Sequence, residues 1–134
     1  MSDEMVIRCC APTLAALKTG SLFNCPFSSR EEMTAGLRAL NRSLTGKGAC
    51  AMPLRYADGK ALVYLYRPEM LEKDLCDPLA RSILKDCGYP ESSPLKEIAW
   101  LRKRLGSCDS FPHEIGLFLG YPSCDVRGFI QQKE

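Results

Sequence analysis

The sequence has little that would mark a site or a compartment. It contains one tryptophan and one histidine, and no apolar run approaches the roughly 20 residues of a membrane-spanning helix. Its start, Met1 to Glu4, lacks the basic and apolar segments of a secretion signal. Linker-like stretches and internal repeats are absent as well. These absences predict a cytoplasmic protein without a membrane partner.

Charge and phosphate-binding motifs are equally sparse. The net charge of +2 is too small to indicate a nucleic-acid surface. The one compact basic run, Arg102 to Arg104, has no interleaved aromatic residues and is typical of a solvated helix end. The segment 45–48 lacks the preceding strand and the spacing of a P-loop. We therefore expect no nucleic-acid partner, which leaves a small molecule, another protein or a second copy in a homodimer.

Cysteine is the residue type that the sequence has in excess. Eight cysteines occur, but none of them forms a C-x-x-C pair. A chain of 134 residues can bury a core without covalent staples. The sequence therefore predicts reduced cysteines, most of them buried as small apolar side chains.

The pattern of apolar residues predicts a single domain over residues 1–134 with a small sheet near its middle. Residues 5–18 are expected to be helical, and 21–25 to form a short strand. Pro12 fits the first turn of a helix, which leaves open whether this helix begins before Cys9. Ser29 and Glu32 form a capping box that starts a helix ending near Gly46. A hairpin joins 50–56 to 61–66 around Asp58-Gly59, and the apolar second strand indicates a central position.

From residue 67 onward every element is expected to be a short helix. Starts are predicted at Pro68, Asp77-Pro78, Ser93-Pro94 and Ser110 or Phe111, and a last helix covers 123–130. The predicted fold class is α+β, with a small antiparallel sheet of two or three strands packed with five to seven short helices.

Segments in three parts of the chain carry a family resemblance. In the last third, the motif FPHEIGLFLGYP spans 111–122 and is followed by Asp125-Val126 and 128–130. The first third contributes 10–15, Lys18 and 21–23, and the middle contributes 62–64 and 66–68. In this combination the chain resembles a family of uncharacterised proteins, a domain of unknown function found mostly in anaerobic bacteria. The resemblance implies a bacterial, cytoplasmic protein from an oxygen-poor setting. The family has no assigned activity, so the resemblance supplies neither catalytic residues nor the identity of a cofactor.

His113 is the first candidate for chemistry because it is the only histidine. It is predicted to lie in the first turn of a helix, where the helix dipole favours a neutral ring. A neutral imidazole could accept a proton, ligate a metal or bind haem iron. The alternative is local packing, with Glu114 favourably placed near the positive helix end.

Cys10 is the candidate nucleophile. It precedes Pro12, and a thiol at a helix start can have a lowered pKa. If His113 approached Cys10, the pair would suit acyl or thiol transfer. The alternative is a buried structural cysteine, and whether the protein is an enzyme stays open.

The ligand-binding candidates are Thr13, Lys18, Arg67 and Glu114, at the ends of predicted elements, and Lys18 and Arg67 are the expected anion binders among them. Arg67 follows a strand and precedes a helix start, which suits a carboxylate or phosphate, or else a salt bridge with Glu69 or Glu72. The leading hypothesis is an accessory or binding protein whose site combines these residues with Cys10 and His113. Its ligand is a small anion, a metal or haem; the alternatives are the Cys/His enzyme and a protein–protein interaction module.

Overall fold

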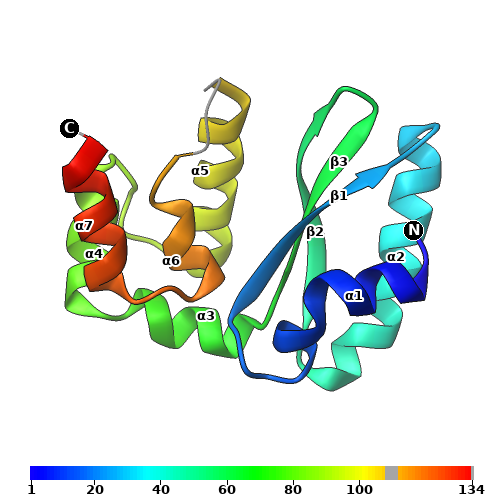
Figure 1. Ribbon diagram of the computed structural model, residues 1–134, viewed down its shortest axis with the longest axis horizontal. Helices are drawn as coiled ribbons and strands as arrows, with labels where there is room; N and C mark the ends of the chain where they lie inside the picture. The colour runs from blue at the N-terminus through cyan, green and yellow to red at the C-terminus, as the bar shows by residue number, and fades with distance from the viewer. Residues whose placement is uncertain (108–111, 134) are drawn as a thin grey trace. The chain divides into compact units, whose positions relative to one another are not determined.

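The computed structural model describes residues 1–107 and 112–133. It divides into two compact units, the N-terminal unit Met1–Pro68 and the C-terminal unit Glu69–Glu134. The described residues form seven α-helices and one three-stranded antiparallel sheet (Figure 1). This confirms the predicted α+β class, whereas the single-domain expectation stays a prediction.

The N-terminal unit contains the whole sheet. Its elements are α1 (Asp3–Leu14), β1 (Gly20–Pro26), α2 (Arg30–Leu44), the 3-10 turn η1 (Thr45–Lys47), β2 (Cys50–Ala57) and β3 (Lys60–Tyr66). The strand order is β1-β3-β2, with both pairings antiparallel. The central position predicted for the 61–66 strand is therefore confirmed, and all six of those residues are buried.

The hairpin between β2 and β3 turns where the sequence predicts it. Asp58 and Gly59 have φ angles of 54° and 72°. Positive φ at both positions is the requirement of a type I′ turn, which matches the twist of the two strands. The pairing is interrupted by a bulge between Pro53 and Arg55.

Both helices of this unit cover one face of the sheet. Alternate residues of a strand point to the same side, and Ala61, Val63 and Leu65 of β3 join one apolar core with residues of α1 and α2. α1 contributes Val6 and Cys10 to that core. The helical residues in it from α2 are Met33, Leu37 and Leu44. On the other face, the rings of Tyr64 and Tyr66 stack with centroids 4.6 Å apart.

Two helix boundaries differ from the sequence-based expectation. The first helix starts at Asp3, because the Ser2 hydroxyl accepts a hydrogen bond from the Met5 N–H, and Pro12 lies in its last turn. The expected helix start beside Cys10 is therefore wrong. In α2 the Ser29 cap is confirmed, with its hydroxyl accepting from Glu32 N–H at 3.1 Å. The chain then continues into η1, and the left-handed residue is Gly48 at φ 79° rather than Gly46.

The C-terminal unit is helical throughout its described part. Its helices are α3 (Pro68–Leu75), α4 (Pro78–Asp86), α5 (Pro94–Ser107), α6 (Ile115–Leu119) and α7 (Ser123–Lys133). The predicted starts at Pro68, Asp77-Pro78 and Pro94 are confirmed, and the Asp77 carboxylate caps α4 by accepting from Ala80 N–H at 3.0 Å. The helix expected from Ser110 or Phe111 begins only at Ile115, and those two residues lie outside the described part.

No helix within residues 1–107 and 112–133 combines the length and apolar character that crossing a lipid bilayer requires.

Candidate functional site

Glu114 of the family motif is a buried structural residue in the C-terminal unit. Its side chain is 2% exposed and forms an ion pair with Arg104. The Tyr89 hydroxyl donates a 3.0 Å hydrogen bond to the same carboxylate. Burial, and then the nearby Glu114 charge, raise the pKa of Tyr89 above its usual range and that of Cys87 to about 11. The carboxylate predicted to bind a ligand is thus already satisfied by two side chains.

A second buried carboxylate belongs to α5. Glu97 is 1% exposed and pairs with Arg81 of α4. Burial raises the pKa of Glu97, and the hydrogen bond and charge of Arg81 oppose that shift. Sequence reasoning missed both Glu97 and Arg104. A signal was present for Glu97: it lies one residue before Ile98 and four before Leu101, on the apolar side of the helix, where a carboxylate needs a cation.

His113 lies before α6 rather than in a first helical turn, so the helix-dipole argument for its neutral ring does not apply. The ring is half-buried and meets the Phe129 ring edge-on, with centroids 4.8 Å apart. Within residues 1–107 and 112–133 no cluster of three His, Cys, Asp or Glu side chains is arranged to hold a metal ion. The metal role predicted for His113 therefore has no three-ligand cluster to support it in that part of the chain.

Four of the predicted site residues lie near the end of α1 in the N-terminal unit: Cys10, Thr13, Lys18 and Arg67. The hydroxyls of Thr13 and Ser21 lie 2.6 Å apart in a buried hydrogen bond. The Cys10 thiol also hydrogen-bonds Ser21 and feels the charge of Lys18. His113 and Glu114 belong to the other unit.

Cys10 does not have the surroundings of an activated thiol. Its side chain has no exposed surface. Burial, and then the neighbouring Cys9, raise its pKa to about 11, although Ser21 and Lys18 act in the opposite direction. A raised pKa lowers the fraction of the nucleophilic thiolate. The seven described cysteines are free: two are buried, three half-buried, and Cys76 and Cys124 are exposed.

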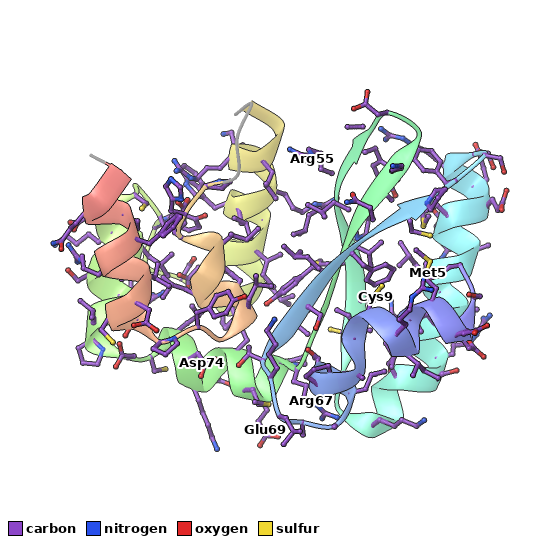
Figure 2. The ribbon with its side chains drawn as sticks, in the orientation of Figure 1. Met5, Cys9, Arg55, Arg67, Glu69 and Asp74 are labelled. Atoms are coloured by element: carbon purple, nitrogen blue, oxygen red, sulfur yellow. The ribbon has the colours of Figure 1, made fainter. Side chains whose placement is uncertain are left out.

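Arg67 satisfies the carbonyl end of α1. Its Nε donates to Thr13 O at 2.7 Å and its Nη2 to Leu14 O at 2.9 Å, while Nη1 donates to Lys47 O at 3.0 Å. Figure 2 shows Arg67 beside the last turn of α1. The last carbonyls of a helix lack partners within the helix, and a guanidinium there also complements the dipole. Each nitrogen of the Arg67 guanidinium thus donates one hydrogen bond to a backbone carbonyl, which gives this side chain a structural role.

A more accessible arrangement lies along α4 in the C-terminal unit. α4 and segment 89–91 form a pocket of about 560 Å³, here called the α4 groove. A smaller pocket of about 310 Å³ flanks α2 in the N-terminal unit. Arg81 and Lys85 lie four residues apart on α4 and supply positive charge, and Glu91 supplies the opposite charge. Leu84, Tyr89 and Pro90 give the groove apolar walls. Its volume is within the range that holds small organic molecules.

Cationic side chains also lie beside the α4 groove. Ser82, one of the lining residues, accepts a 3.0 Å hydrogen bond from Nη2 of Arg127 on α7. The same guanidinium pairs with Asp86 at 3.2 Å. Arg81 is held by Glu97, so its position is fixed from the core side while 27% of its side chain stays exposed. A fixed guanidinium at the wall of a partly apolar groove is a suitable partner for a carboxylate or phosphate.

Residues 6–134, almost the whole chain, match a known protein family. They match the family model described as Protein of unknown function (DUF3793). The chain belongs to this family. No curated protein and no solved structure matches the chain. Family membership confirms the resemblance as far as an uncharacterised domain, and the functional argument therefore rests on the geometry described above.

Proposed function

We propose that the protein is a cytoplasmic binding protein for a small organic anion and that the ligand occupies the α4 groove. The observation that carries the proposal is the pairing of Arg81 and Lys85 on one wall with apolar side chains on the others. An anionic group would meet the two cations, and an apolar body would pack against Leu84 and Pro90. The metal form of the hypothesis lacks a cluster of three His, Cys, Asp or Glu side chains among the described residues.

The groove differs from the composite site expected from the sequence. That site depended on Arg67, whose three nitrogens donate to backbone carbonyls, and on Glu114, which already has two partners. The class of ligand is the same, but the cations are different. The groove also needs no thiolate, so the proposal does not involve the buried Cys10.

Benzoate is a suitable probe because it combines a carboxylate with a flat apolar ring. Addition of benzoate to the ¹⁵N-labelled chain should shift the amide resonances of α4 and of segment 89–91. Benzamide has the same ring without the charge and should bind at least several-fold more weakly, since a charge-assisted hydrogen bond contributes more than a neutral one. Equal shifts with benzamide, or shifts elsewhere only, would rule out an anion site in the groove.

Lys85→Gln is the informative variant because Lys85 is exposed and lines the groove. It should weaken benzoate binding roughly tenfold, given that a charged hydrogen bond is worth about 1.5–3 kcal/mol. Lys96→Gln removes the same charge from an exposed position of α5 outside the groove lining and should bind as the parent does. Arg81 is unsuitable for this test because its loss would leave Glu97 buried without a partner.

A further inference from the structure

The α4 groove carries charges of both signs, and its negative charge has no ion-pair partner. Glu91 lines the groove from the segment after α4, whereas Arg81 and Lys85 line it from α4 itself. The side chain of Glu91 is exposed. In the part of the chain that the structure describes, no ion pair includes Glu91 or Lys85. The groove therefore offers a ligand an unpaired carboxylate as well as an unpaired ammonium group.

The position of Glu91 is determined by the way α4 ends. Gly88 adopts the left-handed conformation with φ 89°, and its N–H bonds to Lys85 O at 3.0 Å. The N–H of Tyr89 bonds to Leu84 O at 2.9 Å. These two bonds form a Schellman motif, which fixes the direction in which the chain leaves a helix. Because Tyr89 is also buried, the backbone two residues before Glu91 is held against α4.

Glu91 also acts on the buried ion pair beside the groove. Burial raises the pKa of Glu97 most, Arg81 opposes this shift, and the charge of Glu91 adds to it. Glu91 and Glu97 therefore share the neighbourhood of Arg81, and together with Lys85 the four side chains carry two positive and two negative charges. A ligand whose only charge is a carboxylate would give this balanced group an excess of negative charge, and Glu91 would repel it.

We infer that the ligand of the α4 groove is an α-amino acid with an apolar side chain, an inference that rests on the function proposed above. Its carboxylate meets Arg81 and Lys85, and its ammonium group meets Glu91. Its side chain packs against Leu84 and Pro90. A zwitterion adds no net charge to the groove. An amine without a carboxylate would be repelled by the two cations, so a molecule with both charges is the better match.

Three ligands that share a phenyl ring test the two charges separately. Phenylalanine carries both charges, hydrocinnamate lacks the ammonium group, and phenethylamine lacks the carboxylate. Each is titrated into the ¹⁵N-labelled full chain near neutral pH, and the amide shifts of α4 and of segment 89–91 are followed. We expect phenylalanine to bind with a dissociation constant roughly tenfold below that of hydrocinnamate, because it adds a charge-assisted hydrogen bond to Glu91. Phenethylamine should bind most weakly.

The outcomes separate this inference from the function on which it rests. Hydrocinnamate that shifts the groove amides and binds as tightly as phenylalanine would overturn the amino acid and leave the anion site in place. If neither of these two ligands shifts the groove amides, the inference and the anion site are both overturned. Phenethylamine that binds as tightly as phenylalanine would show that the cations do not recognise a carboxylate, and would overturn both as well.

Glu91→Gln tests the recognition of the ammonium group directly. It should raise the dissociation constant of phenylalanine roughly tenfold and lower that of hydrocinnamate, so that the preference between the two disappears. Glu72→Gln removes the same charge from an exposed position of α3 outside the groove lining and should keep the preference of the parent chain. Lys85→Gln should weaken both ligands alike, because both carry the carboxylate. A preference for phenylalanine that survives in Glu91→Gln would contradict the proposed contact.

Discussion

Each of the two units of this protein is stabilised internally by a different kind of interaction. The N-terminal unit packs two helices on a sheet whose central strand is apolar from Ala61 to Tyr66. The C-terminal unit buries two carboxylates, Glu97 and Glu114, each against an arginine. Removing an apolar side chain leaves a cavity, whereas removing one partner of a buried ion pair leaves a charge without compensation. The comparison therefore predicts different sensitivities to substitution.

The largest effect is expected for Arg104→Ala in the C-terminal unit. It leaves the Glu114 carboxylate, 2% exposed, with hydrogen bonds from Tyr89 and Cys87 but without a cation, and breaking such a pair costs about 3–5 kcal/mol. Trp100, the only tryptophan, lies on α5 near Tyr89, so its fluorescence reports urea unfolding of this unit. Arg102→Ala is the matched control, because that side chain is exposed on the same helix, and it should change stability by less than about 0.5 kcal/mol. Equal effects of the two variants would show that the buried pair does not hold the unit.

A slightly smaller effect is expected for Leu65→Ala in the N-terminal unit. Leu65 is completely buried in β3, and a cavity at such a position costs about 2–5 kcal/mol. The urea unfolding curve followed by far-UV circular dichroism should show a transition at a lower urea concentration than in the parent chain. The comparison becomes sharper if Trp100 fluorescence keeps its original midpoint in this variant, because the two units then unfold separately. A common shift of both signals would instead show that they unfold as one cooperative structure.

Much of the fold could be predicted because its signals are local. Asp58-Gly59 between two apolar runs is sufficient for the hairpin, and an acceptor followed by proline marks the start of α4. The start of α1 could not be decided, since Ser2 and Pro12 are both start signals. The structure uses Ser2, and it places Pro12 in the last turn.

The candidate site was less predictable because it depends on contacts between distant residues. Arg104 resembles its exposed neighbours in the basic run, but it pairs with the buried Glu114, ten residues away, and its side chain is only 33% exposed. Arg67 was correctly placed at the end of a strand, but the carbonyls that it satisfies belong to residues 13, 14 and 47. The α4 groove depends in the same way on the return of segment 89–91 beside α4.

Arg67→Met should have a moderate effect on the N-terminal unit. The methionine keeps part of the apolar stem but loses three charge-assisted hydrogen bonds to partly exposed carbonyls, which predicts a loss of about 1–3 kcal/mol. Arg67→Lys keeps the charge but cannot reproduce the planar fork, so it should recover less than half of the loss. Thermal unfolding measures both. Full recovery with lysine would indicate that charge near the end of α1, rather than the guanidinium geometry, is what stabilises the unit.

The smallest effect expected here concerns alkaline pH. Burial raises the pKa of Cys10 from its ordinary value of 9 to about 11. As pH rises, the unfolded chain releases this proton first, so the stability contributed by the buried thiol is complete below pH 9 and is lost as pH rises toward 11. At pH 10 the loss is roughly 1 kcal/mol. Cys10→Ala should therefore flatten the dependence of the unfolding free energy on pH in this window, in addition to lowering stability at every pH. Cys124→Ala, at an exposed position, should leave the slope unchanged. An unaltered slope in Cys10→Ala would mean that the thiol ionises as easily in the folded N-terminal unit as in the unfolded chain, and would reopen the case for a reactive Cys10.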